Sequence, residues 1–96
     1  VHFVSQHINL DPDRLKEIAP NSSGIIEHKK HKYGVFRDEN GAVFAVSTKC
    51  PHLGCELVWN EHERSWDCPC HGSRFDYKGK LLSGPAMHDA NSFTVD

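Results

Sequence analysis

The sequence predicts one small all-β domain, and three observations support this. From Gly24 onward, short runs of apolar and aromatic residues alternate with turn residues, as in strands joined by tight turns. Asn40-Gly41 stands between two such runs and is a strong signal for a hairpin turn. The longest uninterrupted apolar run, Ala42 to Val46, has five residues and is too short to cross a membrane. A length of 96 residues is enough for one domain with a modest core.

The first 22 residues read differently from the rest. Asp11 is a candidate N-cap, Pro12 stands at the first helical position and Asp13 adds an early negative charge. A polar segment at residues 21–24 ends this pattern, so we expect a short helix or turn preceded by a linker. The chain begins with Val1 instead of Met, and we expect it to be a domain of a longer protein. We therefore expect a linker with a helix or turn at residues 1–22 and one domain at residues 23–96.

Strands and turns follow one another to the end of the chain. Trp59 and Trp66 lie near the two ends of one expected hairpin, where we expect both in the core and in position to pair across the strands. The basic run at residues 28–32 predicts a solvated hairpin turn, and a guide for an acidic partner is the alternative. The expected strands are residues 25–29, 33–37, 42–47, 56–60, 64–67, 73–77, 80–82 and 92–95.

Two short motifs concentrate cysteine and histidine: Cys50-Pro51-His52-Leu53-Gly54-Cys55 and Cys68-Pro69-Cys70-His71-Gly72-Ser73. Their spacing is Cys50-x-His52, then fifteen residues, then Cys68-x-x-His71. Zinc sites usually group like ligands in C-x₂₋₄-C and H-x₃₋₅-H pairs, whereas Cys and His alternate here. Four Cys in 96 residues are also too few for a disulfide scaffold. The pattern favours a [2Fe–2S] centre in which two His replace two Cys on one iron.

Both motifs, with their glycines and extra cysteines, resemble those of the Rieske family, and the resemblance covers residues 23–95. It implies an antiparallel β-sandwich with an inserted cluster-binding subdomain of two loops and a hairpin. It also implies one [2Fe–2S] cluster per chain. In the family pattern, thiolates at Cys50 and Cys68 hold the buried iron, and imidazoles at His52 and His71 hold the outer iron, which accepts the electron.

The ligand types explain what such a centre does. The oxidised iron–sulfur core carries two positive charges, so two thiolates bring the site to zero, whereas four would bring it to minus two. A neutral site resists an added electron less, and a low dielectric magnifies the difference. Rieske centres accordingly span about −150 to +300 mV, against about −400 mV for plant-type ferredoxins. We therefore expect a one-electron carrier that has no catalytic residues of its own.

The resemblance assigns roles to the remaining motif residues. Cys55 and Cys70 occupy the positions of a disulfide found in the respiratory and photosynthetic cytochrome-complex branch, where it joins the two ligand loops. Ser73 stands where that branch donates a hydrogen bond to a bridging sulfide.

Phe75 stands where the same branch has a Tyr that donates to a ligand thiolate, so we expect a lower potential here. Leu53 and the segment around Pro85 are expected to shield the cluster, although Met87 replaces a second family Pro.

The sequence from Trp66 to Asp76 is similar to Rieske domains fused to the C-terminus of bacterial FAD-dependent oxidoreductases. FAD would then belong to the parent protein, because this chain has no dinucleotide fingerprint. The electron partner would be that flavin domain or another redox protein. Two alternatives remain: the head of a respiratory-type, quinol-oxidising Rieske subunit, and a redox-sensing iron–sulfur domain. Phe75, Met87 and the lack of an anchor helix count against the quinol-oxidising alternative.

Charge and histidine content add little to this interpretation. The net charge of −2 gives no reason to expect nucleic acid or an anionic membrane as a partner. The six histidines outside the two motifs have no ligand spacing, and we expect most of them at the surface. We expect a cytoplasmic location.

Overall fold

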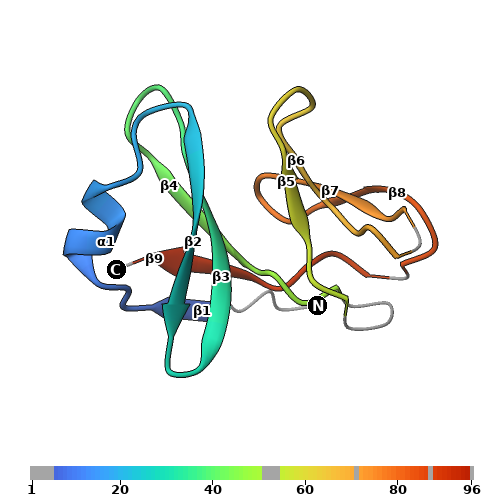
Figure 1. The fold of residues 1–96 in the computed structure, drawn as a ribbon, viewed down its shortest axis with the longest axis horizontal. Helices are drawn as coiled ribbons and strands as arrows, with labels where there is room; N and C mark the ends of the chain where they lie inside the picture. Colours follow the sequence, from blue (N-terminus) through green and yellow to red (C-terminus); the bar gives the residue numbers. More distant parts are fainter. Residues whose placement is uncertain (1–5, 51–54, 71, 87, 96) are drawn as a thin grey trace.

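The computed structural model describes residues 6–50, 55–70, 72–86 and 88–95 and consists of two β-sheets that lie side by side (Figure 1). The five-stranded sheet has the order β1-β9-β4-β3-β2, and the four-stranded sheet has the order β5-β6-β7-β8. The chain leaves the first sheet after β4 and returns to it with β9, so the second sheet is an insertion. The all-β class and the inserted subdomain are therefore confirmed.

The strands follow the turn signals closely. The five-stranded sheet contains β1 (Gln6–Ile8), β2 (Ser22–His28), β3 (His31–Arg37), β4 (Val43–Ser47) and β9 (Ser92–Val95). The four-stranded sheet contains β5 (Val58–Asn60), β6 (Ser65–Asp67), β7 (Arg74–Asp76) and β8 (Leu81–Ser83). All strand pairs are antiparallel except β1 with β9. Among the described residues, no helix is long and apolar enough to span a membrane.

The helix α1 (Pro12–Lys16) forms where the capping signals place it. The carboxylate of Asp11 accepts a hydrogen bond from the backbone N–H of Asp13 at 2.9 Å. After the helix, the guanidinium of Arg37 on β3 donates to the carbonyls of Ile18 at 2.8 Å and Leu15 at 2.9 Å. These bonds add a side-chain donor to carbonyls at and just after the end of the helix, and they fasten the helix to the sheet.

The segment before the helix is part of the sheet. The strand β1 pairs in parallel with β9, and Ile8, Leu10 and Ile18 are buried in the core of the five-stranded sheet. The pairing partner of β1 lies more than eighty residues away in the chain, so no local pattern marks this strand. Residues 6–8 are therefore a strand and not the linker that the sequence suggested. The domain boundary between residues 22 and 23 stays a prediction.

The basic run at residues 28–32 forms the turn of the β2–β3 hairpin, as expected. His28 pairs with His31, which leaves a two-residue turn at Lys29 and Lys30. Both turn residues have positive φ, 50° and 68°, as in the turns that match the twist of antiparallel strands. The lysine side chains of this turn are exposed to solvent.

Trp66 joins the two sheets. It is fully buried, and a Cβ placed on Gly34 of β3 would lie 2.6 Å from the Trp66 ring. Only glycine therefore allows β3 to approach β6 so closely. Trp66 pairs with Trp59 across the β5–β6 hairpin at a ring-centroid distance of 4.9 Å, and Trp59 stacks on Phe36 at 5.2 Å. The cross-strand pair is present and continues into the first sheet. Trp66 lies in the core as expected, whereas Trp59 is half-buried and packs against that core.

Candidate metal centre

Both cysteine-containing motifs leave the sheets as loops with closed ends. The first loop closes where the backbone N–H of Cys50 donates to the carbonyl of Cys55 at 2.7 Å. A β-bridge between Lys49 and Glu56 extends this closure by one residue on each side. The second loop closes where the N–H of Cys68 donates to the carbonyl of Ser73 at 2.7 Å. Each loop thus starts at one of the two cysteines that the family pattern assigns to iron.

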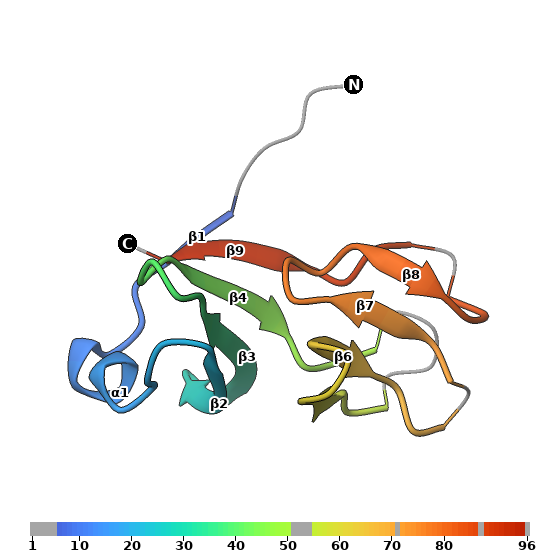
Figure 2. The same cartoon turned by 90° about the horizontal axis from the view of Figure 1, so that it is seen from above.

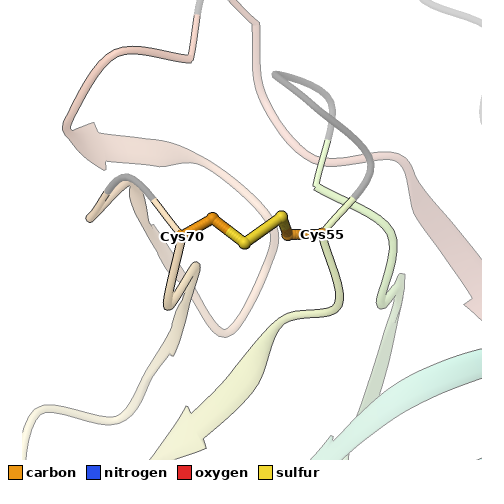
Figure 3. Close-up of a disulfide and its surroundings, with 2 residues drawn as sticks. All are labelled: Cys55 and Cys70. Carbon is orange, nitrogen blue, oxygen red and sulfur yellow. A yellow bond between two sulfur atoms is a disulfide. The ribbon is translucent and has the colours of Figure 1, made fainter.

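A disulfide joins the two loops, as the resemblance predicted. Figure 3 shows the bond between Cys55, at the end of the first loop, and Cys70, inside the second. Their Cα atoms lie 6.4 Å apart, and fifteen residues separate them in the chain. The bond crosses between segments that precede different strands of the second sheet, so it fixes the two loops against each other.

Cys50 and Cys68 supply the buried thiols of the site. Each is 2% exposed, and neither takes part in the disulfide. The sulfur of Cys68 lies within 4.8 Å of the sulfurs of Cys55 and Cys70. Those two sulfurs are bonded to each other and are not metal ligands, so Cys68 is the thiol that this group offers. Two buried thiols in adjoining loops fit an iron–sulfur group, because soft thiolates select such clusters.

Three predicted site residues fall outside the described part of the chain, namely His52, Leu53 and His71. The same is true of Met87. The full ligand set and the shielding role of Leu53 therefore stay predictions.

Ser73 lies in the interior beside the second loop. Its side chain is fully buried, and its hydroxyl oxygen accepts a hydrogen bond from the backbone N–H of Ala86 at 3.0 Å. Because the oxygen serves as acceptor in that bond, the hydroxyl hydrogen remains for a second partner. This arrangement is compatible with the predicted role of Ser73 as a donor to cluster sulfur. Phe75 is also fully buried, in the same core cluster as Cys68, and has no hydroxyl to donate.

The loop that contains Gly84 and Ala86 packs against Ser73. Gly84 has φ of +107°, and a Cβ there would lie 2.3 Å from the Cα of Ser73. The neighbouring Ala86 is buried, whereas Pro85 is exposed. The contact between this loop and the second motif is therefore made by Gly84 and Ala86. The shielding role of Pro85 stays a prediction.

These features define a cluster-binding all-β domain, and comparison with known proteins gives the family. The sequence model of the protein family described as Rieske [2Fe-2S] domain matches residues 11–94, so the chain belongs to the Rieske family. Members of this family hold one [2Fe–2S] cluster and carry single electrons.

The chain is similar to several Rieske proteins. It is 37% identical over 95 residues to YhfW of Bacillus subtilis (strain 168), whose name assigns it to the Rieske 2Fe-2S iron-sulfur proteins. It is 44% identical over 84 residues to the cytochrome b6-f complex iron-sulfur subunit of Synechococcus elongatus. Among solved structures, the plasma membrane Rieske protein PetC3 from Synechocystis PCC 6803 matches with a TM-score of 0.70 and 30% identity. That match covers 86% of this chain and 82% of the PetC3 chain.

The shared region is less than half the length of the first two of these relatives. The match covers 99% of this chain but 19% of YhfW, and 88% of this chain but 42% of the Synechococcus subunit. The ferredoxin of carbazole 1,9a-dioxygenase from Nocardioides aromaticivorans IC177 shares the fold, with a TM-score of 0.64 at 22% identity over 92% of this chain and 86% of that chain.

Proposed function

We propose that this Rieske domain is the electron-transfer module of a larger FAD-dependent oxidoreductase. The observation that supports electron transfer is the pair of buried thiols, Cys50 and Cys68, in two loops that a disulfide joins. The similarity to YhfW supports the larger parent, because the matched region is 19% of that protein's length. The sequence from Trp66 to Asp76 supports the flavin-dependent class by resemblance. We propose a cytoplasmic location for such a parent.

We propose that Cys50, His52, Cys68 and His71 hold the cluster. When bound, the cluster would supply one-electron chemistry at a potential above that of ordinary ferredoxins. The chain itself contributes the burial of the thiols, which excludes water, and the closure of each loop by backbone hydrogen bonds at 2.7 Å. The buried hydroxyl of Ser73 adds a hydrogen-bond donor whose oxygen is already fixed by Ala86.

The ligand set can be tested with histidine variants of this chain. His52→Ala and His71→Ala should each lose the cluster, because the additional cysteines of the two motifs are held in the Cys55–Cys70 disulfide and do not replace the lost ligand. His62→Ala is the matched control, since His62 is exposed at the β5–β6 turn. The measurements are iron and sulfide content and the electron paramagnetic resonance spectrum of the reduced protein. Zinc in place of iron, or full cluster content in both motif variants, would refute the assignment.

The flavin-dependent parent is tested on the full-length protein. The purified parent protein should contain FAD. When the oxidised parent is mixed rapidly with a reductant that reduces the flavin, the cluster should become reduced after the flavin. Removal of FAD should abolish this reduction of the cluster. A parent without FAD would overturn the module proposal while leaving the Rieske assignment intact.

One observation favours a second candidate, the head of a quinol-oxidising Rieske subunit. The chain is 44% identical to a cytochrome b6-f subunit and has the loop-joining disulfide of that branch. Quinol-dependent reduction of the cluster in the full-length protein, without flavin, would favour this candidate over the first.

A further inference from the structure

A pocket of about 390 Å³ lies between the β2–β3 turn and the residues that flank the first motif, which are residues 47–49 before it and Glu56 after it. Its lining includes Lys30, Lys32 and Lys49, and Glu56 is the carboxylate among its lining residues. Three positive charges against one negative charge leave an excess of two on this surface, although the whole chain has a net charge of −2. The basic pocket is thus a local reversal of the overall charge.

Glu56 does not neutralise the whole pocket. Its carboxylate lies 3.8 Å from the ammonium of Lys32 and also accepts a hydrogen bond from the hydroxyl of Thr48 at 3.2 Å. Within the described ranges, neither Lys30 nor Lys49 makes an ion pair, and both side chains are exposed. These two ammonium groups are therefore available to the carboxylates of another molecule.

The basic pocket adjoins the first cysteine-containing loop. Lys49 directly precedes Cys50, and its β-bridge partner Glu56 directly follows Cys55. Neighbouring Cα atoms are about 3.8 Å apart, so the pocket begins one residue from a proposed ligand. Electron tunnelling slows steeply with distance, which favours a docking surface that adjoins a ligand loop over one elsewhere on the domain.

We propose that the basic pocket docks a separate, acidic electron-carrier protein. The inference rests on the proposed electron-transfer function, because a carrier must exchange its electron with two partners. The flavin of the parent would be one partner, and the acidic carrier would be the other. One electron leaves the reduced carrier and one electron arrives at the oxidised cluster, with no bond made or broken. Charge complementarity of this kind mainly raises the association rate.

The test uses a plant-type [2Fe–2S] ferredoxin as the acidic probe, because its potential lies below the Rieske range and the transfer runs downhill. Reduced ferredoxin is mixed with the oxidised, cluster-loaded chain in a stopped-flow instrument. Lys30→Glu/Lys49→Glu should lower the second-order rate constant about fivefold or more at about 0.01 M ionic strength. At about 1 M salt, where the screening length is about 3 Å, the variant and the wild type should agree within about twofold.

Lys16→Glu/Lys80→Glu is the matched control. Lys16 is on α1, at the far side of the first sheet from the inserted sheet (Figures 1 and 2), and Lys80 lines a different pocket. Each Lys→Glu substitution lowers the net charge by two, so both double variants go from −2 to −6. The control should keep its low-salt rate constant within about twofold of the wild type, because local charge and not total charge sets the effect. Equal slowing in both double variants, or no slowing in either, would overturn the docking proposal.

Zero-length carbodiimide cross-linking gives a second readout that does not need the cluster. Cross-links to ferredoxin carboxylates should occur at Lys30, Lys32 or Lys49, and cross-links mainly at Lys16 and Lys80 would overturn the proposal.

Cluster reduction by dithionite distinguishes a failure of the docking proposal from a failure of the electron-transfer function. A chain that dithionite does not reduce lacks the electron-transfer function, whereas a chain reduced normally but slowed equally in both double variants lacks only the docking surface.

Discussion

The disulfide between Cys55 and Cys70 should be a main source of both stability and cluster lifetime. The change is the double substitution Cys55→Ser/Cys70→Ser. A double variant is needed because the sulfur of Cys68 lies within 4.8 Å of both disulfide sulfurs. A single substitution would leave a thiol beside Cys68 that is able to form a different disulfide and hide the effect.

The size of the effect follows from the chain that the disulfide encloses. A separation of fifteen residues corresponds to about 3 kcal/mol of lost loop-closure entropy in the unfolded chain. For a domain of this size, 1 kcal/mol shifts the midpoint of thermal unfolding by roughly 4–8 °C, so the variant should unfold roughly 12–24 °C lower. The cluster should also be lost sooner, because the loops that contain Cys50 and Cys68 would no longer be joined.

Thermal unfolding followed by circular dichroism measures the first effect, and the decay of visible absorbance under air measures the second. Treating the double variant with a thiol reductant is the control, and it should produce no further shift of the midpoint. A midpoint within about 4 °C of the wild type would mean that the disulfide contributes less than about 1 kcal/mol. That result, together with an unchanged cluster lifetime, would refute the proposed role of the bond.

Two further predictions concern Ser73 and its neighbours. Ser73→Ala should lower the reduction potential by about 40 mV, which corresponds to about 1 kcal/mol for one lost hydrogen bond, and Phe75→Tyr should raise it by a similar amount. Protein film voltammetry is the measurement, and the control is Ser65→Ala, a buried Ser whose hydroxyl donates to Asp67 at 2.7 Å and which should leave the potential unchanged. Gly84→Ala should destabilise the fold by about 1–3 kcal/mol more than Gly41→Ala, because both have positive φ but only Gly84 would place a Cβ against Ser73. Equal losses in urea unfolding would show that backbone strain, and not the close approach, decides the cost at Gly84.

Local patterns were sufficient to predict most of the fold. The capping residues around Pro12 predicted α1, and Asn40-Gly41 predicted the β3–β4 turn. The extra cysteines predicted the disulfide through their positions in the family pattern. Each of these features depends on residues that are close in the chain or on a motif with fixed spacing. This explains why the sequence was informative about them.

Contacts between distant segments were not predictable in the same way. The strand β1 depends on parallel pairing with β9, and three residues without clear alternation do not reveal such a partner. The close approach of Gly34 to Trp66 requires two sheets to meet at one point, which neither residue signals alone. The basic pocket likewise combines the β2–β3 turn with Lys49, although the sequence showed only the run at residues 28–32.

The ends of the two thiol-bearing loops are held at several points. The first loop ends on a β-bridge, the second is closed by Ser73, and the disulfide joins them. Gly84 lies directly against Ser73, and the N–H of Ala86 donates to the Ser73 hydroxyl. A site fixed at several points changes little when its charge changes by one electron, so less structural rearrangement opposes the transfer. Loop ends that are held in this way suit a carrier that must accept and release an electron many times.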